Sequence, residues 1–243
     1  MNLYLIMGTH LPEIGACIDS LVEASAPDSG NQVLWPKGLE PVPESLAGIT
    51  VEPFQPEALV DSLPVNDPGN VFLLLDPRLS LLDQIEELAQ ALREAALEPA
   101  KVITCVDAAM AEASPKLQGW LDASIFFSDI VLVGNRATAS KPFLRNFEKR
   151  YQRKCYPCLF MFLKGPGRPV NPRAVLAPDA RRISQVFDLP ESPQDAPPGL
   201  IIEASCDLDA DEEPSHLFPG EDSGKEEALA LIPDIRDCLV TTP

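Results

Sequence analysis

The segment from Gly8 to Gly15 is the first place in the chain where ligand chemistry is expected. It has the sequence GTHLPEIG and joins an apolar run to a stretch of helical spacing. A strand-to-helix turn of this kind is a common phosphate site, because the N–H groups that open the helix face the anion. A phosphate loop also needs clustered glycines, a lysine and a magnesium-binding Ser or Thr. Here the glycines are seven positions apart, lysine is absent, and Pro12 and Glu13 oppose anion binding. The position suits a nucleotide, whereas the residues do not.

Thr9, His10 and Asp107 are the first side chains to test for an unconventional site. His10 is the one histidine of the predicted folded domain. Asp107 follows the apolar run Lys101–Val106, where a carboxylate either binds a ligand or caps the next helix. No spacing indicates a Ser–His–Asp or Cys–His group, so we predict no catalytic residue and no metal site.

Cys155 and Cys158 form a C-x-x-C pair in a basic surrounding. At a helix N-terminus such a pair has a lowered thiol pKa and exchanges disulfides. Here the pair follows a predicted helix and opens a predicted strand, which is the reverse order, and no second pair completes a zinc site. We interpret the two residues as ordinary thiols, with a redox pair or a metal half-site as alternatives. The nearby cations that could favour a thiolate are Arg145, Lys149, Arg150, Arg153, Lys154 and Lys164.

The elements that must position these residues alternate between buried strands and helices. Four of six short apolar runs are nearly free of polar alternation, which is typical of strands covered on both faces. Apolar residues repeat with helical spacing at 11–21, again in the stretch that follows a capping box at Ser80, and at 143–151. Residues 36–70, in contrast, form a proline-rich connection with one expected strand near Ile49–Val51. The sequence therefore predicts an α/β fold with a doubly wound, mostly parallel sheet. The six runs are Leu3–Met7, Gln32–Trp35, Val71–Leu75, Lys101–Val106, Ile130–Val133 and Cys158–Leu163.

Three of these segments carry motifs in a recognisable order. Phe72–Pro77 has the sequence FLLLDP, Val102–Ala108 has VITCVDA, and Phe127–Leu132 has FSDIVL. In place and order they resemble the Walker B strand, the VVTVVDA strand and the ADRIVLNK strand of the CobW-type GTPases, which are P-loop metallochaperones. The resemblance spans roughly residues 1–165 and implies a P-loop-NTPase-like fold. It implies GTP with magnesium as cofactor and nucleotide-binding positions at Gly8, Thr9, His10, Gly15, Asp76, Asp107 and Asn135.

The departures from the family pattern affect every nucleotide-handling motif. The family's GFLGAGKTT-like loop is replaced by the Gly8–Gly15 segment, which is a degenerate Walker A, and Asp76 is the one acid near the Walker B position. In the guanine-reading N-K-x-D, which falls at Asn135, Thr138 replaces the Asp. The Cys-x-Cys-Cys metal motif is missing, and an acidic tail stands in place of the family's second domain. We therefore expect a pseudo-GTPase relative, with an unrelated doubly wound domain as the alternative.

Charge divides the 243 residues, of net charge −18, into an acidic body, a basic band and an acidic tail. Residues 141–182 carry eleven basic and two acidic side chains, whereas 189–243 carry fourteen acidic and two basic ones. We interpret the basic band as a solvated helix face, with an anion site or a dock for the tail as alternatives. So acidic a chain is not expected to bind nucleic acid or an anionic membrane.

Composition also predicts the domain boundary and the compartment. Beyond Leu189 the chain is rich in proline and acids, which predicts a mostly disordered tail with docking points at Leu200–Ile202 and Ala228–Val240. We therefore predict an α/β domain at 1–188 and a tail at 189–243. The sequence has no apolar run long enough to span a membrane and no signal-peptide pattern, and we interpret its six cysteines as reduced thiols. We therefore predict a cytoplasmic protein.

These observations favour a non-catalytic, pseudo-GTPase-like protein that binds a protein partner, without a cofactor and with the tail as regulator or tether. The alternative is a nucleotide-binding CobW-like protein or enzyme that holds GTP and magnesium at the same cleft through a nonstandard loop. A thiol protein that uses Cys155 and Cys158 is a third, less favoured class.

Overall fold

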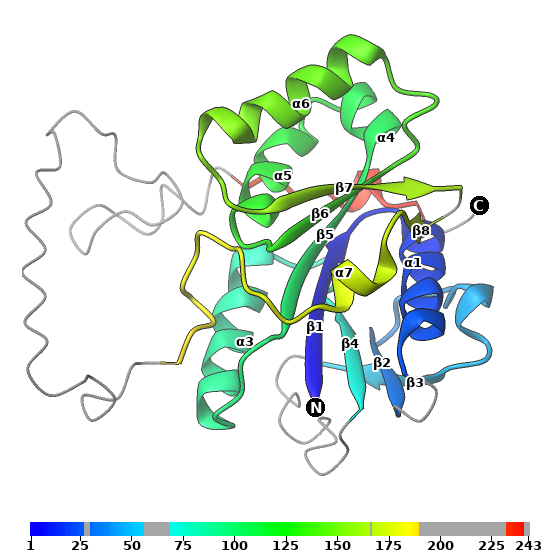
Figure 1. Ribbon diagram of the computed structural model, residues 1–243, viewed down its shortest axis with the longest axis vertical. Coiled ribbons are helices and arrows are strands. Elements are labelled where there is room, and N and C mark those ends of the chain that lie inside the picture. Colours follow the sequence, from blue (N-terminus) through cyan, green and yellow to red (C-terminus); the bar gives the residue numbers. More distant parts are fainter. Residues whose placement is uncertain (27–29, 56–68, 166, 190–231, 241–243) are drawn as a thin grey trace, which may run out of the picture.

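An eight-stranded sheet forms the centre of the molecule (Figure 1). The structure is a computed structural model, and it describes residues 1–26, 30–55, 69–165, 167–189 and 232–240. The strand order is β3-β2-β4-β1-β5-β6-β7-β8. Neighbouring strands are parallel except β7 and β8. The strands are β1 (Asn2–Gly8), β2 (Asn31–Pro36), β3 (Thr50–Phe54), β4 (Asn70–Leu74), β5 (Lys101–Asp107), β6 (Ile130–Gly134), β7 (Leu159–Lys164) and β8 (Arg168–Pro169).

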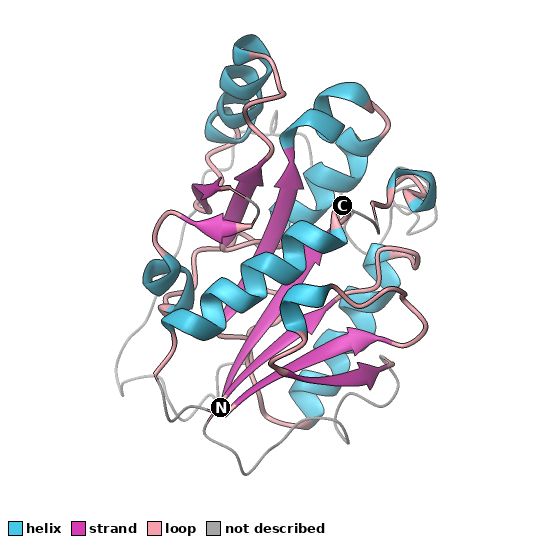
Figure 2. Ribbon diagram, turned by 90° about the vertical axis from the view of Figure 1, so that its right-hand side faces the viewer, coloured by secondary structure: helices cyan, strands magenta, loops and turns pink. Residues whose placement is uncertain are grey.

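Helices cover both faces of the sheet, and each face has its own apolar cluster (Figure 2). On one face, α1 (Leu11–Ala24) and α7 (Pro172–Leu176) pack against the even-numbered side chains of β1. On the other, α3 (Leu81–Glu94), α5 (Leu117–Phe126) and α6 (Lys141–Arg153) pack against its odd-numbered side chains. The remaining helices are α4 (Ala108–Ala113), η1 (Glu44–Leu46) and η3 (Arg236–Cys238).

The predicted α/β fold with a mostly parallel sheet is confirmed. Every residue of β4, β5 and β6 is buried, as the continuous apolar runs indicated. The α3 N-terminus is capped as predicted, since Ser80 Oγ accepts a hydrogen bond from Asp83 N. The proline-rich connection contains η1 and β3, and its residues 56–68 lie outside the described part of the chain.

Strand register brings the carboxyl ends of three central strands together. Gly8 of β1 lies beside Cys105 of β5, and Asp107 of β5 lies beside Gly134 of β6. The residues that follow β1, β5 and β6 therefore meet at one edge of the sheet, where ligands bind in doubly wound folds.

Residues 232–240, called the C-terminal segment below, lie at this same edge. Val240 forms an isolated parallel bridge with His10, and Ile235 is buried in the apolar cluster of α3 and α5. This confirms a docking point in Ala228–Val240 for its described residues. The predicted disorder of 190–231, and the docking point at Leu200–Ile202, lie outside the described residues. Among the helices described, none has the length and apolarity to span a membrane.

Candidate functional site

The turn between β1 and α1 is short. Only Thr9 and His10 separate Gly8, the last residue of β1, from Leu11, the first of α1. A side chain at Gly8 would collide with the Ile14 side chain and the Cys105 carbonyl, so glycine here permits α1 to pack closely on β1 and β5. The glycine serves helix packing, and no extended loop is left to surround an anion.

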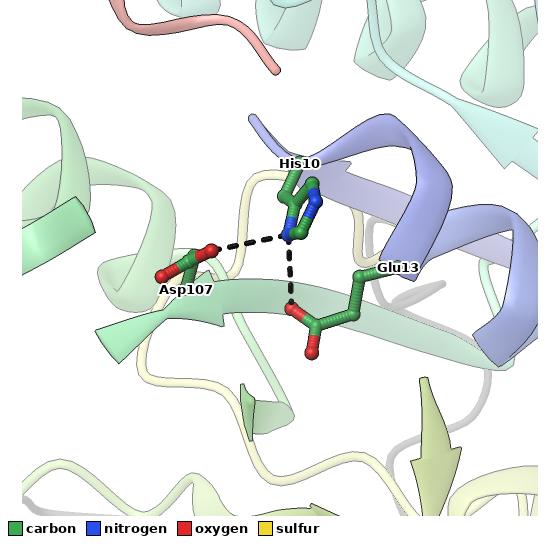
Figure 3. A group of neighbouring side chains, drawn as sticks. All are labelled: His10, Glu13 and Asp107. Carbon is green, nitrogen blue, oxygen red and sulfur yellow. Dashed lines mark ion pairs between the residues drawn. The ribbon is translucent and has the colours of Figure 1, made fainter. Parts of the chain in front are cut away.

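His10, Asp107 and Glu13 gather at the end of this turn (Figure 3). His10 Nδ1 lies 3.0 Å from Asp107 Oδ2 and 3.7 Å from Glu13 Oε2. Asn135, which follows β6 with a positive φ of 47°, donates from Nδ2 to Asp107 Oδ2 at 2.6 Å. Asp107 Oδ1 accepts a hydrogen bond from Met110 N at 2.9 Å and so caps α4. Asp107 is thus both a helix cap, one of its two expected roles, and a member of this cluster.

The charges in the cluster stabilise one another. Hydrogen bonds to Asp107 and Glu13 raise the pKa of His10 to about 9, although partial burial opposes the shift. Burial acts to raise the pKa of Asp107, but hydrogen bonds from His10, Met110 N and Asn135 outweigh it and lower the pKa to about 2. At neutral pH the imidazolium is therefore held against two carboxylates.

The helix start offers few N–H groups to an anion. Leu11 N donates to Val240 O at 2.8 Å, Ile14 N donates to His10 O at 3.1 Å, and Pro12 has no N–H. Val240 N also donates to Thr9 O at 2.9 Å, so the C-terminal segment pairs with the turn on both sides of His10. Together with the Glu13 and Asp107 carboxylates, this arrangement disfavours a phosphate and favours a cation.

The other predicted cofactor-binding residues serve local structure. The hydroxyl of Thr9 contacts Met110 Sδ at 3.3 Å, and Gly15 lies in α1, where a side chain would collide with Pro43 of the connection before η1. Asp76 follows β4 and forms an ion pair with Arg78, and its backbone N–H donates to Gln84 Oε1. The structure therefore brings His10, Asp107 and Asn135 together, with Gly8 and Thr9 just before His10 in the chain. Gly15 and Asp76 contact other parts of the chain.

Two residues of the site, Glu13 and Val240, were not among the cofactor-binding residues predicted from the sequence. Glu13 is 4% exposed and points at His10, and its spacing of three residues from a histidine on a helix was the signal that could have identified it. The contact between Val240 and His10 had no local signal, because 230 positions separate the two residues in the sequence.

The C-x-x-C pair has no geometry that activates a thiol. Cys155 is exposed in the turn after α6, and Cys158 is buried just before β7. Burial raises the pKa of Cys158 to about 11, which agrees with the interpretation as an ordinary thiol and not with the redox alternative, in which nearby cations would favour a thiolate.

Comparisons with known proteins support the fold. No protein-family model and no curated protein matches the chain. The signal recognition particle receptor FtsY from Elizabethkingia anophelis, solved in complex with GDP, is similar over 78% of this chain and 64% of its own, with 9% identity and a TM-score of 0.51. Zn(II)-bound YjiA GTPase from E. coli is matched over 79% of this chain and 66% of its own (12% identity, TM-score 0.46). Chloroplast FtsY from Physcomitrella patens is matched over 72% and 65% (8% identity, TM-score 0.46).

The chain thus spans slightly less than two thirds of the length of each of these structures. Identities this low carry information about architecture only. The similarity to FtsY, together with the strand order and the helices on both faces, shows that the described chain has the fold of the P-loop GTPases.

Proposed function

We propose that this chain is a non-catalytic, pseudo-GTPase-like protein that acts as a protein-binding module, with a peptide at the edge where a GTPase holds nucleotide. The observation that carries the proposal is the seating of the C-terminal segment on the β1–α1 turn. Val240 exchanges two backbone hydrogen bonds with that turn, one to Thr9 O and one from Leu11 N. Of these two groups, the Leu11 N–H is a donor at the start of α1 that a bound phosphate would approach, and Val240 O occupies it.

The charges of the turn support the same proposal. Triphosphate binding needs a magnesium site and cationic or N–H groups around the phosphates. Within the described residues, the turn instead presents the Glu13 and Asp107 carboxylates, with His10 between them. A nucleoside triphosphate placed here would lie close to two carboxylates, with His10 as the one cationic group between them.

The contacts of the C-terminal segment support a peptide as the ligand of this edge. Ile235 is 3% exposed and packs in the apolar cluster that contains Leu81, Leu82 and Trp120. Asp237 lies 3.7 Å from Lys116 at the rim. A cavity of about 400 Å³ remains between this segment and residues 78–82, so the groove is larger than its present occupant. An extended peptide with an apolar anchor and flanking acids has the chemistry that fits this edge.

Nucleotide titration tests the first half of the proposal. We expect calorimetry with GTP, GDP and ATP, with and without magnesium, to give no saturable binding at millimolar nucleotide. The same titration on a chain that ends at residue 231 separates a blocked site from an absent one. Micromolar binding by either form would contradict the proposal. Binding by the shortened form only would identify the alternative, a nucleotide-binding protein that holds GTP and magnesium at this cleft and is covered by its tail.

Peptide binding in trans tests the second half. A fluorescent peptide of residues 232–243 should bind saturably to the chain that ends at residue 231, as followed by anisotropy. The same peptide with Ile235→Asp is the matched control and should not bind, because the buried apolar anchor is replaced by a charge. Equal signals from the two peptides would show that the edge does not recognise this segment.

The proposal also places the protein in the cytoplasm, where it would encounter a protein partner.

A further inference from the structure

We propose that His10, Glu13 and Asp107 form a binding site for a divalent first-row transition-metal ion of the zinc class. The donor atoms would be His10 Nδ1, Glu13 Oε2 and Asp107 Oδ2, and they converge from the start of α1 and the end of β5 (Figure 3). Each of the three residues offers a ligand atom that lies within 4.8 Å of those of the other two. The site is independent of whether the neighbouring edge binds a peptide or a nucleotide.

The distances suit an ion with short bonds to nitrogen and oxygen. Zinc binds imidazole nitrogen and carboxylate oxygen at about 2.0–2.2 Å, which places the ligand atoms of a tetrahedral site roughly 3.3 Å apart. His10 Nδ1 lies 3.0 Å from the Asp107 oxygen and 3.7 Å from the Glu13 oxygen, one on each side of that value. Three protein ligands leave the fourth position open to water, as in zinc sites that exchange ligands.

The charge balance of the cluster calls for a cation. Glu13 is 4% exposed, and in the described part of the chain its carboxylate lies beside His10. Its ion pair there is the 3.7 Å contact with His10, which Asp107 shares at the shorter distance of 3.0 Å. Two largely buried carboxylates therefore face a single imidazole ring, a grouping of oxygen and nitrogen donors that a bound cation would stabilise. A divalent ion bound by a neutral imidazole and both carboxylates would make the cluster neutral.

The surroundings hold the three ligands in place. Asn135 Nδ2 donates to Asp107 Oδ2 at 2.6 Å and fixes the carboxylate that faces His10. A side chain at Gly134 would collide with the Glu13 carboxylate, so only glycine at the end of β6 leaves room for that carboxylate to reach the cluster. Imidazole with carboxylate oxygens suits zinc and its neighbours better than magnesium or calcium, which prefer oxygen ligands.

The test uses the full chain with Cys155→Ser as background, because the exposed thiol is a competing ligand for zinc. Zinc is titrated by competition with a chromophoric chelator, and Co²⁺ absorption reports the ligand type. We expect one zinc ion to bind, and Co²⁺ to give ligand-field bands without a thiolate charge-transfer band. Glu13→Gln and His10→Ala should each weaken zinc binding at least about tenfold.

Matched controls separate a lost ligand from a lost fold. Glu23→Gln makes the same change on an exposed carboxylate of α1 and should leave zinc affinity unchanged. Asp107→Asn keeps an oxygen for the Met110 N–H that caps α4 while removing the charge, so it tests the ligand in a folded chain. Thermal melts followed by circular dichroism verify the fold of each variant. Equal zinc affinity in Glu13→Gln and Glu23→Gln, or a Co²⁺ spectrum with thiolate bands, would overturn the site and leave an ion-pair cluster only.

Discussion

At the scale of single residues, Asp129 is the most deeply buried acidic side chain among the described residues. Its carboxylate is 0% exposed and accepts hydrogen bonds from the backbone N–H groups of Val102 and Arg181. Arg182 Nη1 pairs with it at 3.2 Å, and the Arg182 side chain is 4% exposed. This pair fastens the segment after α7 to the amino end of the sheet.

Arg182→Ala should therefore lower the free energy of unfolding by about 3 kcal/mol, because it leaves a buried carboxylate without its strongest partner. Equilibrium urea unfolding measures the change. Glu23→Gln is the control, since Glu23 and Arg168 form an exposed pair at 3.8 Å that is worth at most about 1 kcal/mol. Similar losses in the two variants would show that Asp129 does not depend on Arg182.

The two thiols of the C-x-x-C pair should differ sharply in reactivity. Because burial raises the pKa of Cys158 to about 11, its thiolate is scarce below that pH, whereas Cys155 is exposed. We expect iodoacetamide at pH 8 to label Cys155 in the native chain, and to label Cys158 only as the pH approaches 11 or after unfolding. Peptide mass spectrometry follows both sites, and rapid labelling of Cys158 at pH 8 would contradict its burial.

Single residues also show where sequence reasoning reached its limit. His10 and Asp107 could be singled out because each occupies a turn or strand end that the fold places at the ligand edge. Glu13 could be seen only as an obstacle to phosphate, since its approach to His10 depends on Gly134, about 120 positions away. Asp76 and Gly15 were placed by analogy with nucleotide-binding positions; in the structure Asp76 pairs with Arg78, and Gly15 lies against Pro43.

At the scale of elements, the C-terminal segment has one fully buried apolar residue, Ile235, with Ile232 and Cys238 packed beside it, and two backbone hydrogen bonds to the β1–α1 turn. Ile235→Asp should release this segment without unfolding the sheet, because few other contacts tie it down. Amide hydrogen exchange should then accelerate at Leu11 and Val240, which lose their partners, and stay unchanged in β5. Ile183→Asp, at an exposed isoleucine, is the control and should leave all three unchanged. Protection that persists at Leu11 in Ile235→Asp would mean that the backbone pairing holds by itself.

The elements differ in how well the sequence could predict them. The central strands and the helices α1, α3 and α6 were predictable, because their apolar residues repeat with the period of a buried strand or a one-sided helix. The helix α5 was not assigned, since it is apolar around most of its surface and lacks a one-sided pattern. The two-residue β8 and five-residue α7 are too short to show a period, and they form against β7 and α1.

At the scale of the whole molecule, the charge asymmetry is the feature with the widest consequence. The exposed basic residues of and beside α6 form a positive surface, and among described residues no ion pair joins it to the segment 232–240. Asp237 pairs with Lys116 and Asp234 with Arg236 instead. The surface consists of Lys141, Arg145, Lys149, Arg153 and Lys154.

The twelve acids within 190–231 are then the part of the tail that can mask this surface. Replacing them with Asn and Gln keeps the Val240 contact and removes twelve negative charges from a net of −18. We expect the neutralised chain to bind a heparin column at about 50 mM salt and the native chain to flow through, because opposite charges attract strongly only at low ionic strength. Adding Lys149→Glu and Arg153→Glu to the neutralised chain should abolish retention if α6 is the surface involved. Identical elution of the native and neutralised chains would show that the acids do not screen it, and the positive surface of α6 would then be an ordinary solvated helix face.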